Sequence, residues 1–272
     1  MSQRFKLLEI CRRALSAFAV VTAVVPIYLL IKQAFSVELD SFAWPPRWIP
    51  HHLTLEHLHK VTSTGELRES LIRSAEVATV AACTATLLGT MLAYAMTRDL
   101  RARRWGLAAL TASRLLPMIA VALPLATVLI RVGLYDTPSG LGLALVHAAI
   151  ALPVAAILLL GAFAKIPLEL EDAAFLDGAS QLTILLRIYL PQLKQALAAA
   201  FVLSFLSSWD EFGFGLLLQP TNRTLPPLIY YYAVFGDVGA ASALALVSTA
   251  PVLIVLVALR HILIRQPKPP AF

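Results

Sequence analysis

Long apolar runs dominate the pattern of the chain. Four of them hold no Asp, Glu, Lys or Arg over at least 18 residues: Ala14 to Ile31, Val77 to Thr97, Thr137 to Ala164 and Val238 to Leu259. A helix needs about 20 mainly apolar residues to cross a hydrocarbon core, where it also satisfies its own backbone hydrogen bonds. The pattern therefore predicts membrane-spanning helices.

Two further runs indicate spans with polar interruptions. Trp105 to Ile130 is apolar except for Arg114, and Gln195 to Leu218 is apolar except for Asp210 and Glu211. The six runs together predict an all-α membrane protein with a single transmembrane domain over residues 1–272. The predicted spans cover residues 14–35, 72–97, 105–130, 138–164, 195–218 and 238–262.

Composition supports a lipid environment. Apolar residues make up 59% of the chain and charged residues 14%, with a mean hydropathy of +0.77. A soluble domain carries roughly 25% charged residues, so the soluble, fibrous and disordered classes are excluded. Of the two cysteines, Cys11 falls near one membrane face and Cys83 inside a helix, so we expect no disulfide.

The basic residues predict the orientation. Six spans put both termini on one side, and fourteen Lys and Arg residues fall on that side against seven on the other. Positive charge is enriched in cytoplasmic loops, so both termini are predicted to lie inside. The net charge of +6 is accordingly an orientation signal, and we expect no nucleic-acid partner. The first apolar run exceeds the 7–15 residues of a signal peptide core, which predicts an uncleaved anchor.

Five prolines lie inside the predicted spans: Pro26, Pro117, Pro124, Pro153 and Pro251. Each removes a backbone donor and bends its helix. The bends indicate either ordinary kinks of membrane helices or helices that line a cavity opening to alternate sides.

The outer segment from Ser36 to Ser70 permits two interpretations. Apolar residues alternate there with Glu56, His57 and Lys60, which is typical of a short amphipathic helix at the membrane surface. The same segment also offers a candidate metal cluster of four histidines: His51, His52, His57 and His59.

The inner segment of residues 165–194 predicts a helix-turn-helix. Glu169, Glu171 and Asp172 supply the acidic residues that favour a helix N-terminus. Gly178 is placed to end this helix and Ser180 to cap a second one. Because the segment leaves alanines and leucines exposed, it is either a docking surface or a plain solvated loop.

The same segment carries a spaced motif. It consists of Asp172-Ala173-Ala174, three residues, Gly178, nine residues, and Ile188-Tyr189-Leu190-Pro191. The motif resembles the cytoplasmic loop signature of ABC importer permeases, in which Glu stands in place of Asp172. The other defined positions match that signature.

Four further stretches look like the maltose-type carbohydrate permeases of that family. They are Asp177-Gly178-Ala179, Gly133 to Thr137, Ser208-Trp209-Asp210-Glu211-Phe212 and Thr224-Leu225-Pro226. The tail from Gln266 to Pro270 departs from the glycine-rich basic tail that is usual in the family.

The resemblance implies a non-catalytic subunit of a bacterial inner membrane importer, with a sugar or oligosaccharide as its small-molecule substrate. It implies three partners: a dimer of ATPase subunits that binds ATP and Mg, a second permease subunit, and an external solute-binding protein. The chain has no Gly-x-x-x-x-Gly-Lys phosphate loop, and we expect it to bind no cofactor.

The resemblance also implies which residues couple this chain to the ATPase, with Leu168 to Asp177 as the coupling helix. The coupling residues are Glu169, Glu171, Asp172, Ala173, Ala174, Asp177, Gly178, Ile188, Leu190 and Pro191.

A polar stripe in the fifth predicted span indicates a substrate pathway. Ser204, Ser207, Ser208 and Glu211 fall on one helical face, with Asp210 beside them. Acids in a membrane usually face a wet cavity or a partner, although these two could simply mark the outer interface. Their carboxylates would suit sugar hydroxyls or a cationic solute such as a polyamine.

Two more intramembrane residues bear on the class of transporter. Arg114 is predicted either to reach the inner face along its span or to pair with an acid across a cavity. His147 is predicted to be a hydrogen-bonded core residue. An ion-coupled secondary transporter would instead use Arg114, His147, Asp210 and Glu211 as a relay, but no inverted repeat supports it. No nucleophile set supports an intramembrane enzyme.

Overall fold

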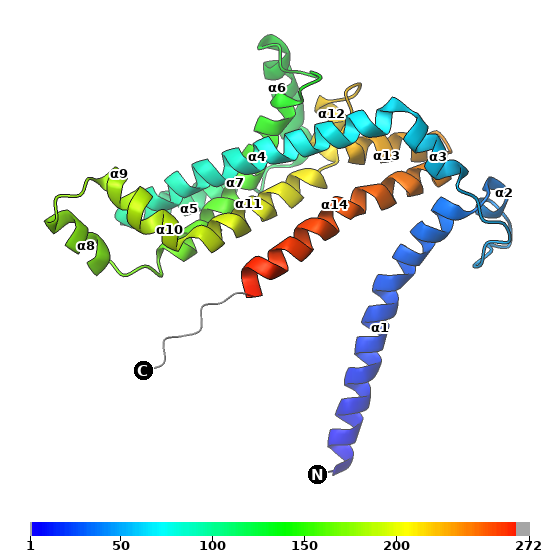
Figure 1. Ribbon diagram of the computed structural model, residues 1–272, viewed down its shortest axis with the longest axis horizontal. Coiled ribbons are helices and arrows are strands. Elements are labelled where there is room, and N and C mark those ends of the chain that lie inside the picture. Colours follow the sequence, from blue (N-terminus) through cyan, green and yellow to red (C-terminus); the bar gives the residue numbers. More distant parts are fainter. Residues whose placement is uncertain (1, 265–272) are drawn as a thin grey trace. The chain divides into compact units, whose positions relative to one another are not determined.

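Helices make up the fold of the computed structural model, which describes residues 2–264 (Figure 1). Within those residues there is no β-strand, and one isolated bridge joins Ser36 to Leu53. The predicted all-α class is confirmed. Arg265, Lys268 and the tail from Gln266 to Pro270 lie outside the described residues.

The helices and their bounds follow the chain in order. They are α1 (Ser2–Phe35), α2 (Glu38–Ser41), α3 (Glu56–Ser63), α4 (Gly65–Arg98), α5 (Leu100–Ser113), α6 (Met118–Arg131), α7 (Leu141–Phe163), α8 (Glu169–Leu176), α9 (Gln181–Ile184), the π-helix η1 (Leu185–Tyr189), α10 (Leu190–Gln192), α11 (Lys194–Trp209), α12 (Gly213–Leu218), α13 (Leu225–Val234) and α14 (Val238–Ile264).

Three helices among the described residues, α1, α4 and α7, are long and apolar enough to cross a membrane. The helical run Gln181–Gln192 and α11 are together long and apolar enough to form a fourth membrane span, with a bend of 78° between them. The predicted span of residues 105–130 is divided between α5 and α6, and that of residues 195–218 between α11 and α12. The count of six spans and the inward orientation of both termini stay predictions.

The break between α5 and α6 has its cause in Pro117. The residue lacks a backbone N–H, and its ring disfavours a helical conformation in the residue before it. Pro117 precedes α6 with an extended backbone, at φ −66° and ψ 135°. Figure 1 shows α6 turned away from the direction of α5. The bend predicted at this proline is therefore a complete break.

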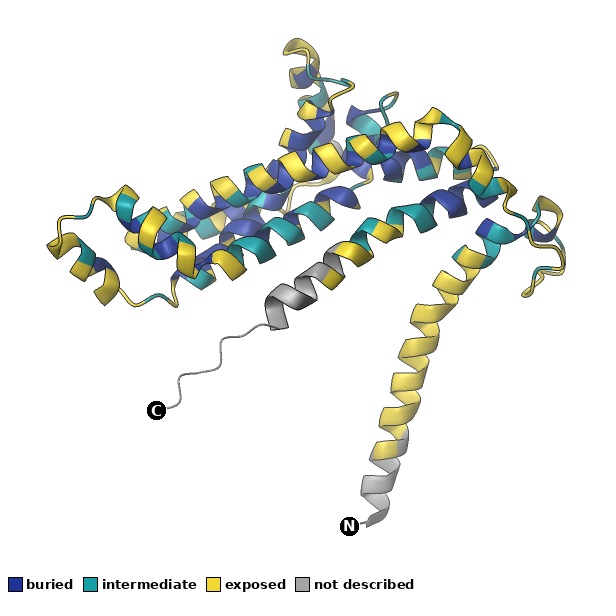
Figure 2. Cartoon of the chain, viewed as in Figure 1, coloured by how far each residue is buried: buried dark blue, intermediate teal, exposed yellow. Residues whose placement is uncertain are grey.

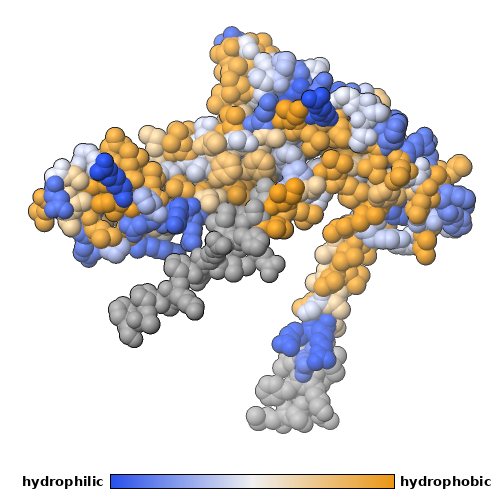
Figure 3. Space-filling view, in the orientation of Figure 1, coloured by the Kyte–Doolittle hydropathy of each residue, from blue (hydrophilic) through white to orange (hydrophobic). Residues whose placement is uncertain are grey.

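The chain divides into two compact units, which we describe separately. The first holds, among the described residues, 2–68 and 228–250, and within it α1 packs against α3. Most of α1 is apolar and exposed, with Leu15 at 69% and Phe18 at 66% (Figures 2 and 3). A helix that is apolar all round suits lipid or neighbouring membrane helices.

The second unit holds, among the described residues, 69–227 and 251–264, and α7 lies within it. Thirteen of the 23 residues of α7 are buried, and the helix packs against α5, α11 and α12. Small residues let the helices approach closely: a Cβ placed on Gly89 of α4 would lie 3.1 Å from the Cβ of Ala155. α7 is thus the scaffold that holds the polar groups described below.

Candidate functional site

The inner segment of residues 165–194 folds as a helix, a turn and a second helix, as predicted. α8 ends before Gly178, whose φ of +81° is the left-handed conformation that glycine favours. Ser180 caps α9 by accepting a hydrogen bond from the Thr183 N–H at 3.3 Å. The second helix then widens into the π-helix η1, which the sequence did not predict. Figure 1 shows α8 standing off from the long helices at one end of the unit.

Glu171 anchors the buried face of this segment. The buried carboxylate forms an ion pair with Arg98 at the end of α4 and accepts a hydrogen bond from the Tyr189 hydroxyl. Tyr189 is itself buried, with its ring centroid 5.7 Å from that of Tyr94 and 5.4 Å from that of Phe163. Burial and the hydrogen bond to Glu171 raise the pKa of Tyr189, so its phenol stays protonated and donates.

Sequence reasoning missed Arg98 and Tyr189 as parts of this site. Tyr189 lies between Ile188 and Leu190 at a position that the family signature leaves open to any residue, so the motif carried no signal for it. Arg98 is one of the fourteen basic residues whose distribution predicts the orientation of the chain, and the sequence pattern indicated no further role for it. A buried acid in α8 needs a cation, and this requirement is the signal that could have pointed to Arg98.

The other predicted coupling residues divide into a set that packs against the core and a set that is exposed. Ala174 and Ile188 pack on the buried cluster that contains Tyr189, and Leu190 is half-buried. The exposed members are Glu169, Asp172, Ala173, Asp177, Gly178 and Pro191.

Two leucines flank the exposed acids of α8. Leu168 is 65% exposed and Leu176 is 90% exposed. Figure 3 shows hydrophobic and hydrophilic residues mixed at this end of the unit. Exposed apolar side chains between carboxylates suit a protein partner better than water.

A second polar site lies where α11 ends and α12 begins. The Glu211 carboxylate accepts hydrogen bonds from the backbone N–H groups of Phe214 at 2.9 Å and Gly215 at 3.0 Å, so it caps α12. Its Oε2 lies 3.1 Å from Nε2 of His147 in α7, and Nδ1 of His147 lies 2.7 Å from the Ser208 hydroxyl. His147 is buried with both ring nitrogens engaged, as predicted for a core histidine.

The polar stripe predicted along the fifth span is divided by the structure. Ser204 and Ser208 are buried, whereas Ser207 and Asp210 are exposed. The Ser204 hydroxyl has no hydrogen-bond partner among the described residues. Ser208 and Glu211 come together at His147. The assignment of the stripe to a solute pathway stays a prediction.

An open hollow of about 420 Å³ lies beside the break between α5 and α6. Its lining is mainly apolar and includes Arg114, Phe214 and, from α7, Ala149 and Pro153. Arg114 is the C-cap of α5, and the first residue of that helix lies about 20 Å away along the axis. Arg114 therefore faces the hollow and does not reach the inner end of α5. Among the described residues no acid forms an ion pair with it.

Asp136 joins two loops of the second unit. Its backbone φ is +50°, and its carboxylate accepts hydrogen bonds from the N–H groups of Asn222 at 2.9 Å and Thr221 at 3.3 Å. Burial opposes ionisation of this carboxyl, but the hydrogen bonds from Thr221 and Asn222 outweigh it and lower the pKa of Asp136. The contacts join the Gly133 to Thr137 stretch to the chain just before Thr224.

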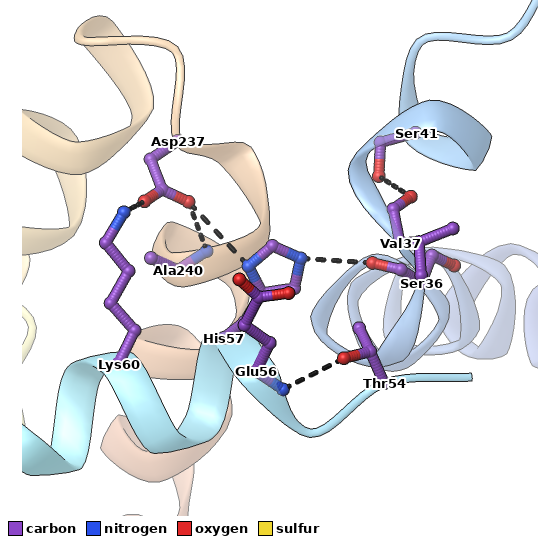
Figure 4. Close-up of polar contacts among 9 residues, drawn as sticks. All are labelled: Ser36, Val37, Ser41, Thr54, Glu56, His57, Lys60, Asp237 and Ala240. Atoms are coloured by element: carbon purple, nitrogen blue, oxygen red, sulfur yellow. Dashed lines mark hydrogen bonds and ion pairs between the residues drawn. The ribbon is translucent and has the colours of Figure 1, made fainter. Parts of the chain in front are cut away.

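The outer segment of the first unit contains α3, the short helix predicted there. Figure 4 shows His57 between the Ser36 carbonyl, 3.0 Å from its Nε2, and the Asp237 carboxylate, 3.9 Å from its Nδ1. Lys60 also pairs with Asp237, which accepts the Ala240 N–H at 2.9 Å. Burial opposes ionisation of Asp237, but the hydrogen bonds from Lys60 and Ala240 lower its pKa.

The other histidines of the candidate metal cluster lie in different surroundings from His57. His51 and His52 donate their backbone N–H groups to the Asp40 carboxylate, at 2.8 and 3.3 Å, and His59 is exposed. Across residues 2–264, no three His, Cys, Asp or Glu side chains are grouped to hold a metal ion.

Comparison with known proteins gives matches in sequence and in fold. Residues 85–267 match the family described as binding-protein-dependent transport system inner membrane component. The ABC transporter permease protein ORF1 of Streptomyces antibioticus is 32% identical over 208 residues, which cover 75% of this chain and 90% of the relative. The trehalose transport system permease protein SugB of Mycobacterium tuberculosis is 26% identical over 228 residues, covering 81% and 82%.

The fold is that of a solved transporter subunit. A chain of a bacterial ABC transporter involved in the import of the acidic polysaccharide alginate superposes with a TM-score of 0.76 at 20% identity. The match covers 96% of this chain and 98% of that chain. At this identity the likeness shows a shared fold.

Proposed function

Because the chain belongs to the family of inner membrane components of binding-protein-dependent transport systems, we propose that it forms half of the solute pathway of an ATP-driven importer of a saccharide. The observation that carries the proposal is the family match over residues 85–267, which contains the loop motif in and after α8. The permease has no catalysis of its own in this role.

The exposed face of α8 is proposed to dock on the ATPase. Leu168 and Leu176 offer apolar contact, and Asp172 and Asp177 offer charge for a basic partner residue. Glu171 supports this role from behind, because its ion pair with Arg98 joins α8 to the end of α4. A push on α8 would thereby reach a long helix of the second unit.

The remaining subunits follow from the same proposal. A dimer of ATPase subunits would bind ATP and Mg, a second permease would complete the pathway, and an external protein would deliver the solute. A solved alginate importer with a TM-score of 0.60 is in complex with a solute-bound periplasmic protein. We place the chain in the bacterial inner membrane with six spans and both termini inside.

The relatives favour a saccharide as cargo. Their names include permeases for sulfoquinovosyl glycerol, trehalose and diacetylchitobiose. A polyamine or another small cationic or zwitterionic solute is the alternative that the Asp210 and Glu211 carboxylates suggest. Glu211 is hydrogen-bonded to His147 and to the start of α12, and this engagement supports a saccharide over a cationic solute.

Reconstitution of the importer complex in liposomes tests the proposal. Uptake of a panel of disaccharides and polyamines would be measured with and without ATP, together with the ATPase activity that each solute stimulates. We expect ATP-dependent uptake of a saccharide. Uptake that an ion gradient drives without ATP would contradict the proposal. Uptake of polyamines and of no saccharide would also contradict it.

A docking variant with a matched control tests the role of α8. Leu176→Asp places a charge in the apolar contact and is expected to abolish co-purification of the ATPase. Leu39→Asp alters a leucine of similar exposure, 86% against 90%, in α2, and is expected to leave co-purification unchanged. Equal recovery of the ATPase with both variants would refute docking through α8.

A further inference from the structure

Arg114 lies at the depth of the middle of α7. The hollow that it lines is shared with Ala149, Ile150 and Pro153, which fall at the ninth to thirteenth of the 23 residues of α7. α7 is one of the helices long and apolar enough to cross a membrane. A guanidinium at mid-depth of a bilayer is costly, and such a group faces a cavity or pairs with an anion.

The part of the chain that the structure describes offers Arg114 no anion. Its side chain forms none of the ion pairs there, and it is exposed to the hollow. Glu211 lies close by, because Phe214 both lines the hollow and donates its N–H to Glu211. Both carboxylate oxygens of Glu211 are already engaged by His147 and by the start of α12.

The hollow has the properties of a small-molecule site. Its volume of about 420 Å³ falls within the range of roughly 300–1,000 Å³ that is usual for such sites. Its walls are apolar side chains such as Leu116, Leu125 and Val146, and Arg114 is the one ionisable residue in the lining. Apolar walls strengthen the attraction between a cation and an incoming anion.

We propose that Arg114 binds an anionic group of the transported solute in this hollow, so that the cargo is an acidic saccharide. The proposal rests on the proposed function and specifies its substrate class. The planar guanidinium donates two parallel hydrogen bonds to a carboxylate or sulfonate, which fixes the orientation of the sugar. A polyamine would meet repulsion at the same point.

Binding measurements on the purified importer complex test the role of Arg114 without relying on transport. Isothermal titration calorimetry would compare matched probe pairs, namely cellobiose, maltose and trehalose, each with the acid in which one terminal hydroxymethyl group is a carboxylate. We expect an acid member to bind roughly ten- to a hundredfold more tightly than its neutral counterpart, the range of a hydrogen bond to a charged group.

Three variants test whether Arg114 causes the preference for the acid probe. Arg114→Gln is expected to remove it, and Arg114→Lys to keep a weaker one, because lysine retains the charge and loses the paired geometry. Arg131→Gln, at the exposed end of α6, is the control and is expected to keep the full preference. The lysine variant and the control show whether a loss with glutamine reflects charge or misfolding.

The outcomes separate this proposal from the proposed function. ATP-dependent uptake by the wild type with no acid preference would overturn the role of Arg114 and leave the importer intact. An acid preference that Arg114→Gln abolishes, without ATP-dependent uptake, would support Arg114 and overturn the importer. If Arg114→Gln instead dissociates the second permease and leaves the preference unchanged, Arg114 pairs with that subunit and the proposal is wrong.

Discussion

Among single residues, Glu211 shows how one side chain can define the local structure around it. A carboxylate in a membrane protein needs partners that replace water, and Glu211 has three of them in His147, Phe214 and Gly215. Its contacts join α7 to the start of α12. Asp210, its neighbour in sequence, is exposed and takes no part in this network.

Substitution of Glu211 should therefore affect folding as well as transport. Glu211→Ala leaves the N–H groups of Phe214 and Gly215 and the ring of His147 without their acceptor. We expect a loss of about 1–3 kcal/mol in the free energy of unfolding, the cost of a buried polar group left unpaired. Thermal unfolding in detergent would measure it, and solute uptake should fall while the ATPase still assembles.

The control for this prediction is the neighbouring acid. Asp210→Ala removes an exposed carboxylate and should change stability by no more than about 0.5 kcal/mol. Equal unfolding temperatures for the two variants would show that the Glu211 network contributes no stability.

At the scale of elements, two helix breaks meet in the second unit. α6 starts at Met118 and α12 at Gly213, and a Cβ placed on Gly213 would lie 2.1 Å from the Met118 sulfur. A larger residue at position 213 would therefore displace the flexible Met118 side chain. The cap by Glu211 and the hollow beside Arg114 both border this meeting point, so the two interrupted spans form one local structure.

α8 is the element whose attachment we expect to control coupling. Glu171→Gln replaces the carboxylate that pairs with Arg98 and accepts from Tyr189, so the link from α8 to α4 weakens. We expect the ATPase to stay bound, since the exposed face is unchanged, and the amount of solute moved per ATP to fall. Uptake and phosphate release in the same liposomes would measure this ratio.

Glu169→Gln provides the comparison for the coupling prediction. It neutralises an exposed acid of the same helix and leaves the contact with Arg98 in place. If both variants lower the transport ratio equally, the charge of α8 matters and the anchor does not.

At the scale of the whole molecule, each compact unit carries its own interactions and α1 contributes little to a core. Its apolar surface is exposed over most of its length, as expected for a helix that meets lipid. The positive-inside bias and the six predicted spans together make the orientation of the chain testable.

Cysteine labelling would measure that orientation. Both native cysteines are first replaced, by Cys11→Ser and Cys83→Ala. In that background, Gln181→Cys at the start of α9 should react with a membrane-impermeant maleimide only when the reagent has access to the inner side of the membrane. Ser139→Cys, just before α7, should react from outside. Both positions are exposed, so a difference in reaction reports the side of the membrane. Labelling of Gln181→Cys from outside would refute the orientation.

The sequence alone determined the features that depend on local chemistry and on the solvent. Uncharged runs require lipid, so the all-α membrane class followed from composition and length. Gly178 and Ser180 specify the end of α8 and the start of α9 through backbone conformation and capping, and both were predicted correctly.

Tertiary structure decided which side chains meet across the fold. Glu171 and Asp172 are adjacent acids, yet one is buried on Arg98 and the other is exposed, because packing on Tyr189 selects one face of α8. The pairing of His147 with Glu211 joins residues 64 positions apart. Hydrophobic patterning predicts that such groups are enclosed, but their partners depend on helix packing, which brings distant residues together.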